Sequence, residues 1–256
     1  MSLLTVEALS KAFGGNVAID DLSLSVRQGA VHSIIGPNGA GKTTLFNLVT
    51  GIYTPDSGRI LVDGRDTTGL APYRMAGLGL SRTFQNLQVF FNMTALENVM
   101  VGMHLHCDSR FLPAMLRLPR VVRRDAEIAG EAAELLRFVG LADSIGADSD
   151  AMPYGALKRL EIARALATRP RLLLLDEPAA GLNPSETTEI DDLIQKIAGT
   201  GVTVVLVEHD MRLVMGVSEH ILVLDRGALL AEGSGEEIRH NPDVVAAYLG
   251  EEGRYL

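Results

Sequence analysis

The sequence of 256 residues contains no tryptophan, one cysteine and only 5% aromatic residues. With Cys107 alone, no intrachain disulfide can form, which excludes a disulfide scaffold and fits a reducing compartment. Basic residues are also few, because 23 Lys and Arg stand against 32 Asp and Glu, giving a formal net charge of −9. Proteins that bind nucleic acid need a basic surface against the phosphates, so we expect no nucleic-acid partner.

Long apolar runs are also lacking. Apolar runs such as residues 172–175 and 202–207 fall far short of the roughly 20 residues of a membrane helix. The first residues show no basic stretch ahead of an apolar one, so we expect no secretory signal and a cytoplasmic protein. The hydrophobic content of 47% is sufficient for one compact domain with a subdomain.

The sequence changes character along its length. Up to about residue 84, short apolar runs alternate with turn signals such as Gly14-Gly15, which predicts strands joined by hairpins. Residues 94–141 have helical periodicity that ends at Gly140, which predicts a helical insertion. Beyond Ala156, helices alternate with strand-like runs, which predicts a parallel sheet.

Two helical faces are predicted from this periodicity. The face in the insertion comprises Ile128, Ala132, Leu135, Leu136 and Val139. Residues 236–250 predict a docked terminal helix after Pro242, with an apolar face of Val244, Val245, Tyr248 and Leu249.

A glycine-rich loop follows the strand-like residues 30–35 and precedes the helical residues 45–49. The loop matches G-x-x-x-x-G-K-[ST] in the strand, loop and helix context that this motif requires, and comprises Gly36, Pro37, Asn38, Gly39, Ala40, Gly41, Lys42, Thr43 and Thr44. Its backbone N–H groups and the helix N-terminus would cradle a polyphosphate. Lys42 would reach the terminal phosphates and Thr43 would offer a hydroxyl to Mg²⁺. A chance match in a glycine-rich turn is the weaker alternative.

A carboxylate pair follows the apolar run at residues 172–175. Asp176 would complete the Mg²⁺ shell, and Glu177, one residue beyond the strand, could face an attacking water. The alternative is that Asp176-Glu177-Pro178 only caps a helix that begins before Ala179.

The chain resembles the ATP-binding cassette (ABC) ATPases over nearly its whole length. Besides the two motifs above, the resemblance rests on Gln85 within residues 82–86, Tyr154-Gly155 ahead of residues 160–166, residues 180–183, and Glu208-His209-Asp210. Residues 153–155, 175–184 and 241–250 are similar to the LivG type of subunit in branched-chain amino acid importers.

The resemblance implies an α/β fold of the P-loop NTPase class. A mainly parallel sheet would be joined by an N-terminal antiparallel β subdomain and an inserted α-helical subdomain. We expect residues 1–85 and 160–235 to form the nucleotide-binding core with its β subdomain. Residues 86–159 would form the helical subdomain with the signature loop, and residues 236–256 a C-terminal helix and tail.

The resemblance also assigns roles to single residues. Phe13 would stack on adenine, Gln85 would contact the metal and the water, and His209 would hold the γ-phosphate and orient Glu177. The alternatives are a core phenylalanine beside a turn, a solvated loop glutamine, and a histidine that caps a helix.

The signature loop of the family, commonly Leu-Ser-Gly-Gly-Gln, aligns with residues 152–156 and has proline at its second position. Pro153 offers neither a hydroxyl nor an N–H to the γ-phosphate of the opposing subunit, so Tyr154 and Gly155 would bind through their amides. The resemblance therefore implies that the two sites of a dimer with a different ATPase subunit would be unequal.

The implied function is ATP hydrolysis, with ATP and Mg²⁺ as cofactors, that powers import of branched-chain or related amino acids. The implied partners are a second ABC ATPase subunit in a homo- or heterodimer, two permease subunits and, indirectly, a solute-binding protein. The protein would lie on the cytoplasmic face of the membrane as a peripheral subunit. The alternatives are a non-transport ABC ATPase and a regulatory subunit that binds ATP with little turnover.

Three further features have no settled role. The soft-metal ligands at residues 103–107 are predicted not to form a metal site, because His104 and His106 are two positions apart. The arginines of residues 110–124 could face lipid or the permease, or form a solvated helix face. The apolar side chains between residues 87 and 93 could receive a permease helix or pack in the interior.

Overall fold

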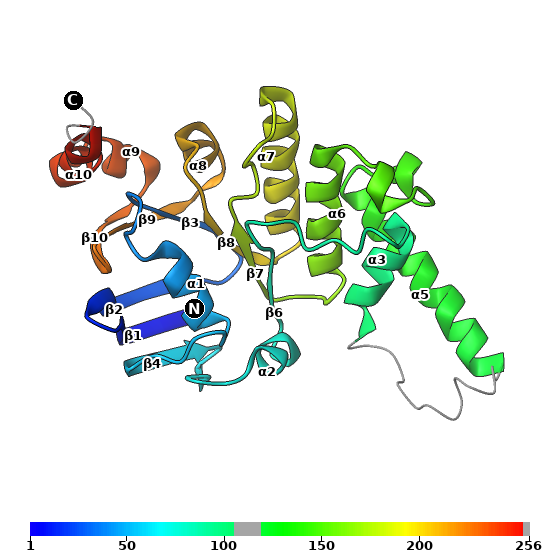
Figure 1. Cartoon of the computed structure of the whole chain (residues 1–256), viewed down its shortest axis with the longest axis horizontal. Helices are drawn as coiled ribbons and strands as arrows, with labels where there is room; N and C mark the ends of the chain where they lie inside the picture. Colours follow the sequence, from blue (N-terminus) through cyan, green and yellow to red (C-terminus); the bar gives the residue numbers. More distant parts are fainter. Residues whose placement is uncertain (105–118, 253–256) are drawn as a thin grey trace. The chain divides into compact units, whose positions relative to one another are not determined.

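The computed structural model describes residues 1–104 and 119–252. Two compact units are formed, one by Met1–Arg82 with Arg171–Leu256 and the other by Thr83–Pro170. The first unit holds two sheets with helices, and the described part of the second is helical (Figure 1). This architecture confirms the predicted fold class.

An antiparallel sheet of four strands lies in the first unit, in the order β2-β1-β4-β5. Gly14 has a φ of 60° in the turn between β1 and β2, so the predicted hairpin is present where glycine allows a left-handed backbone. A second hairpin at Asp63-Gly64 joins β4 to β5. The strands span Ser2–Phe13 (β1), Asn16–Arg27 (β2), Ser57–Val62 (β4) and Arg65–Asp66 (β5).

A sheet of six strands, in the order β10-β9-β3-β8-β7-β6, forms the rest of the first unit's framework. Every pair in it is parallel except β9 with β10. The central strands β3, β7 and β8 are buried at every position, as expected for continuous apolar runs covered on both faces. The strands span Val31–Ile35 (β3), Leu80–Arg82 (β6), Leu172–Asp176 (β7), Thr203–Val207 (β8), His220–Asp225 (β9) and Ala228–Gly233 (β10).

The helix α1 joins the two sheets. Its apolar residues, Phe46 among them, share one buried cluster with side chains of β1, β2 and β4 and of β7, β8 and β9. This packing fixes the helix that follows the phosphate loop. The helices of this unit span Lys42–Val49 (α1), Pro72–Gly77 (α2), Pro184–Gly199 (α7), Met211–Val217 (α8), Gly235–Arg239 (α9) and Pro242–Glu252 (α10).

The second unit is built from helices that pack on one another. Thr94 begins α3 with a capping box to Glu97, and Gly140 follows α5 with a φ of 77°. On the predicted face of α5, Ile128, Ala132 and Leu136 are buried, and Val139 just beyond the helix is buried too; Leu135 is partly exposed. The elements span Ala95–Gly102 (α3), Pro119–Phe138 (α5), Ala142–Ser144 (η2), Ser149–Ala151 (η3) and Tyr154–Leu166 (α6).

Two details differ from the prediction. Residues 160–166 belong to α6, which packs on α3 and α5, so the compact helical unit extends to Pro170 rather than ending at residue 159. In the terminal segment, the helix predicted after Pro242 is α10, and a further short helix, α9, precedes it. Val244 is buried while Val245 is 44% exposed, so the predicted apolar face is narrower than expected.

Candidate nucleotide and metal site

Three neighbouring strands of the six-stranded sheet bring the predicted site residues of the first unit together. Val207, the last residue of β8, pairs with Ile34 of β3 on one side and with Asp176 of β7 on the other. The glycine-rich loop, Asp176 with Glu177, and His209 therefore all leave the same edge of the sheet. Ligands of open α/β sheets bind at this carboxyl edge.

The loop of residues 36–41 runs from β3 into α1 as predicted, and two of its glycines are required by space as well as by backbone angle. A Cβ on Gly36 would lie 2.1 Å from the carbonyl oxygen of Leu224, and one on Gly41 would lie 2.6 Å from that of Ala18. Their φ angles of 148° and 100° lie in the region that favours glycine. These contacts hold the loop against the sheet and leave Asn38 and Gly39 exposed.

Lys42 and Thr43 occupy the first turn of α1 with different exposure. Lys42 is 7% exposed, and its Nζ donates to the carbonyl oxygens of Gly36 at 2.5 Å and Pro37 at 2.9 Å. Thr43 is exposed, so its hydroxyl is accessible to a ligand. The ammonium group is thus already folded into the loop that would hold a polyphosphate.

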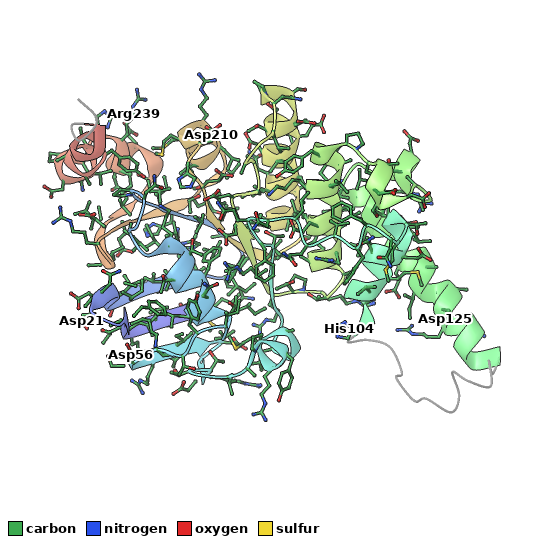
Figure 2. All side chains as sticks on the ribbon, in the orientation of Figure 1. Asp21, Asp56, His104, Asp125, Asp210 and Arg239 are labelled. Atoms are coloured by element: carbon green, nitrogen blue, oxygen red, sulfur yellow. The ribbon has the colours of Figure 1, made fainter. Side chains whose placement is uncertain are left out.

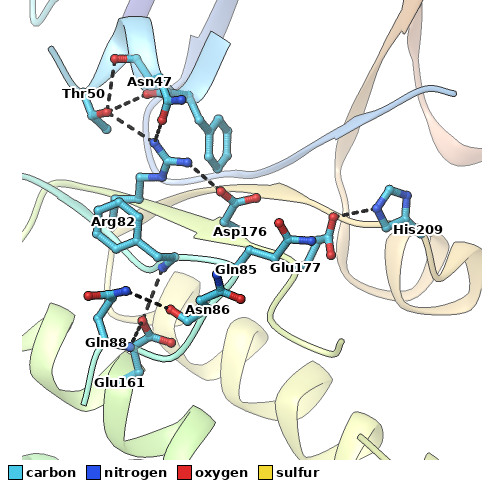
Figure 3. A network of polar contacts seen from close by, with 12 residues as sticks. Asn47, Thr50, Arg82, Gln85, Asn86, Gln88, Glu161, Asp176, Glu177 and His209 are labelled. Atoms are coloured by element: carbon cyan, nitrogen blue, oxygen red, sulfur yellow. Dashed lines mark hydrogen bonds and ion pairs between the residues drawn. The ribbon is translucent and has the colours of Figure 1, made fainter. Parts of the chain in front are cut away.

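Asp176 is buried at 3% exposure, and its Oδ2 accepts a hydrogen bond from Arg82 Nη2 at 2.6 Å (Figure 3). The Arg82 side chain is itself buried at 5% exposure. Arg82 has no role predicted from the sequence, although its place between a strand and Gln85 is a usable signal. A carboxylate, a threonine hydroxyl and phosphate oxygens form the oxygen donor set that suits Mg²⁺.

Glu177 faces His209 directly. Its Oε1 lies 2.6 Å from His209 Nε2, and its side chain is 16% exposed (Figure 3). Glu177 has a φ of 49°, an uncommon angle for a residue with a side chain, and its N–H donates to the Val207 carbonyl at 2.9 Å. The strained backbone turns the chain sharply after β7. Residues 177–181 form a turn rather than a helix, so the interpretation of Asp176-Glu177-Pro178 as a helix cap is wrong.

Glu208 ties the loops after β7 and β8 together. It is 4% exposed, and its carboxylate accepts hydrogen bonds from the N–H groups of Ala179 at 2.8 Å and His209 at 2.9 Å. Asp210, labelled in Figure 2, caps α8, so the interpretation of His209 as the capping residue is wrong. From the sequence, Glu208 is predicted only as part of a motif, although an acidic residue directly after a buried strand is a usable signal.

Phe13 lies at the end of β1 and is 43% exposed, which excludes the interpretation of a core phenylalanine. Its ring meets that of Tyr53 edge to face, with 5.2 Å between centroids, and Lys11 Nζ lies 5.5 Å from the ring centre. The two exposed rings form an aromatic surface on which a base could stack. No pattern in the sequence linked Tyr53 to Phe13.

Gln85 belongs to the second unit and has an exposed side chain. Its carbonyl accepts a hydrogen bond from Lys158 Nζ at 3.4 Å. The N–H groups of Phe84 and Gln88 donate to Glu161 Oε1 at 3.3 and 3.4 Å (Figure 3). Burial raises the pKa of the Glu161 carboxyl. The loop that carries Gln85 is thus anchored by its backbone to α6.

The signature loop leads into the N-terminus of α6. Pro153 is the residue before the first helical turn and provides no side-chain cap; Tyr154 is 44% exposed and Gly155 is buried. The first-turn N–H groups of a helix have no partner within the helix, and helix N-termini commonly bind anions.

The remaining features are only partly described. His106 and Cys107 lie outside the described residues, and His104 Nδ1 is 3.1 Å from the Val101 carbonyl. Among the described residues, no group of three or more His, Cys, Asp or Glu could hold a metal ion. Of the arginine stretch, Arg123 and Arg124 each form an ion pair with Glu127, and residues 110–118 are not described.

The apolar side chains between residues 87 and 93 divide between the two interpretations. Val89 is buried, whereas Phe90 and Phe91 are 44% and 49% exposed. The Arg164 guanidinium lies over the Phe90 ring at 5.3 Å.

The phosphate loop after β3, with a carboxylate at the end of the parallel strand β7 on the far side of β8, defines a P-loop nucleoside triphosphatase. The chain belongs to the ABC transporter family, whose model matches residues 19–180. A second model, described as a branched-chain amino acid ATP-binding cassette transporter, matches residues 228–254. The chain is therefore an ABC ATPase.

Relatives in bacteria are similar over nearly their full length. The chain is 48% identical to the high-affinity branched-chain amino acid transport ATP-binding protein BraF of Pseudomonas aeruginosa, covering 97% of this chain and 98% of that protein. It is 44% identical, with the same coverage, to the protein LivG of Escherichia coli strain K12.

Solved structures of ATP-binding cassettes share the fold. The ADP conformation of MJ1267 matches with a TM-score of 0.85 at 32% identity, covering 98% of this chain and 99% of that one. A dimeric post-hydrolysis state of MJ0796 bound to ADP and Pi matches with a TM-score of 0.76 at 25% identity, covering 90% and 98%.

Proposed function

We propose that the glycine-rich loop and the ends of β7 and β8 bind and hydrolyse Mg-ATP. The observation that carries this proposal is the pairing of Val207 with both Ile34 and Asp176, since it brings three motifs to one sheet edge. Residues 36–44 bind the phosphates through backbone N–H groups, and Lys42 meets their terminal charges. Phe13 stacks on the adenine. Thr43, Asp176 and Gln85 hold Mg²⁺, which supplies charge neutralisation to the phosphates.

Glu177 is the group that activates the attacking water. Its carboxylate accepts the water proton or polarises the water, and His209 fixes its direction through the 2.6 Å contact. His209 also contacts the γ-phosphate. The backbone strain at Glu177 supports this role, because strained residues persist where the surrounding structure holds a functional geometry.

The energy of hydrolysis powers import of branched-chain or related amino acids through a membrane permease. The names of the bacterial relatives and the C-terminal family match support this substrate class. Among the described residues, no helix is long and apolar enough to cross a membrane. We therefore place the chain as a peripheral subunit on the cytoplasmic face, bound to two permease subunits that receive solute from a binding protein.

The proposed transporter also contains a second ABC ATPase subunit. Each phosphate loop in such a dimer faces the signature loop of the other chain, here through the amides of Tyr154 and Gly155. Because Pro153 supplies no hydroxyl, we propose a heterodimer in which the companion retains a serine and the two sites are unequal.

The test is purification of the tagged chain from membranes, identification of its partners, and ATPase assays after reconstitution. Stimulation by leucine, isoleucine or valine through a binding protein is expected. Stimulation by urea or short amides alone would contradict the substrate class, and co-purification with no membrane protein would contradict the transport role.

A further inference from the structure

The buried ion pair between Arg82 and Asp176 is not explained by the proposed hydrolysis. Arg82 follows two strand residues of β6, and its guanidinium reaches in two directions (Figure 3). Nη2 donates to Asp176 Oδ2 at 2.6 Å, and Nη1 donates to Asn47 Oδ1 at 2.7 Å. The same group lies 5.2 Å from the centre of the Phe46 ring.

These contacts connect three elements at one point. Asp176 ends β7, Arg82 ends β6, and Asn47 with Phe46 belongs to α1, the helix that begins at Lys42. A guanidinium group is planar and presents its donors in a fixed fork, so the two hydrogen bonds set the distance between their acceptors. The carboxylate of β7 is therefore held at a defined position relative to α1.

We propose that Arg82 is a positioning residue for the magnesium site. It holds Asp176 by Oδ2 against α1, so that the carboxylate is already oriented when the metal arrives with the phosphates. This inference rests on the proposed role of Asp176 as a metal ligand. Loss of a residue that orients a metal ligand typically lowers metal affinity or activity about 10- to 100-fold.

Stability alone does not account for this arrangement. A buried ion pair gives little net stability over apolar side chains of the same size, because removing two charges from water offsets their attraction. The second hydrogen bond of Arg82, to Asn47, does not offset the cost of burying the Asp176 charge. It fixes the direction from which the guanidinium group approaches the Asp176 carboxylate.

The test measures metal-dependent nucleotide binding rather than turnover. A fluorescent ADP analogue is titrated with Mg²⁺ and again with EDTA, and the ratio of the two affinities defines the metal gain. We expect Arg82→Met to lower the metal gain about 10-fold or more, with the EDTA affinity within about twofold of wild type. Arg82→Lys keeps the positive charge but loses the forked guanidinium group, so it should retain only part of the wild-type metal gain. Arg59→Met, which breaks an exposed pair with Glu7, is the matched control.

A double-mutant cycle separates positioning from general damage. In the Asp176→Asn background, Arg82→Met should change the metal gain no further, because the group it orients is gone. An equal drop in both backgrounds, or an unchanged gain in Arg82→Met, overturns the inference. An unchanged gain in Asp176→Asn alone would instead contradict the proposed metal role of Asp176.

Asn47→Ala covers the case in which Arg82→Met fails to fold. This variant keeps the ion pair and removes the shorter of the two hydrogen bonds from Arg82 Nη1 to the end of α1, leaving the one to Thr50 Oγ1 at 3.4 Å. A gain reduced about threefold is expected from the loss of one hydrogen bond to a charged group. A gain equal to that of wild type would overturn the proposal.

Discussion

The two units differ in how completely they build their part of the proposed site. In the first unit, Asp176 and Glu177 are each held by a named partner, Arg82 and His209, at 2.6 Å. In the second unit, the signature loop ends in an uncapped helix N-terminus with Tyr154 exposed. The carboxylates of the first unit are thus held in place by side chains of the same chain. The signature loop of the second unit presents backbone N–H groups with no side-chain cap.

The two units therefore have different roles in the proposed function. Under the proposed function, the first unit supplies the residues that bind the phosphates, whereas the signature loop of the second would contribute to hydrolysis only when it meets a nucleotide on another subunit. Changes in the first unit should therefore affect the chain by itself, and changes in the signature loop should act through a dimer.

The largest effect is expected from Lys42→Ala. Removing the ammonium group takes away the charge that faces the terminal phosphates, so ATP affinity should fall about 100-fold or more. Isothermal titration with Mg-ATP measures it, with Lys196→Ala on the exposed side of α7 as the control. Unchanged affinity in Lys42→Ala would remove the claim that the first unit binds nucleotide through this loop.

Glu177→Gln should retain nucleotide binding and slow turnover by about 100-fold, the order expected when a base or water-orienting group is lost. Steady-state phosphate release and ATP affinity are measured on the same preparation. Glu189→Gln, an exposed glutamate of α7, serves as control. Near-normal hydrolysis by Glu177→Gln would refute its assignment.

Glu208→Gln should lower turnover about 10-fold while ATP affinity stays within about twofold. The amide has one acceptor oxygen and an NH₂ group, so it cannot accept from both Ala179 and His209, and one charged hydrogen bond is lost. Separate measurement of kcat and KM tests whether turnover alone changes, with the exposed Glu219→Gln as the control. Equal changes in both parameters would argue for a structural role only.

Pro153→Ser should raise hydrolysis by the isolated chain severalfold. The serine would stand at the cap of α6 and return a hydroxyl to the loop, part of the roughly 100-fold that one preorganised donor can supply. The same change in a chain that carries Glu177→Gln should give no rise. An unaltered rate of ATP hydrolysis in Pro153→Ser would mean that Pro153 does not limit the contribution of the signature loop to hydrolysis.

The smallest effect concerns acid stability of the first unit. Burial, aided by the nearby charges of His220 and Arg27, lowers the pKa of His32 from 6.5 to about 4. The unfolded chain binds a proton below 6.5 that the folded chain refuses until about 4, so stability is lost as pH falls across that window. His32→Gln should reduce the difference in Tm between pH 7.5 and pH 5 by a few degrees. An unchanged difference would contradict this source of pH dependence.

Local motifs in the sequence predicted much of the fold. The phosphate loop, the buried strands at residues 172–175 and 202–207, and the hairpin at Gly14 follow from spacing and turn chemistry, which act over a few residues. The helix predicted after Pro242 is present as α10, whereas the short helix α9 ahead of it was not singled out.

Contacts between residues far apart along the chain could not be predicted from the sequence. The pairs of Arg82 with Asp176 and of Glu208 with Ala179 join positions 94 and 29 residues apart, and they depend on the strand order of the folded sheet. Tyr53 against Phe13 is a pair of the same kind.

The most direct test compares ATP hydrolysis by the isolated chain with hydrolysis after addition of a companion ATPase subunit and the permease. We predict slow turnover by the isolated chain, a marked rise on assembly, and loss of most of the added activity when this chain carries Glu177→Gln. Full-rate hydrolysis by the isolated chain, or assembled activity that survives Glu177→Gln, would contradict the account.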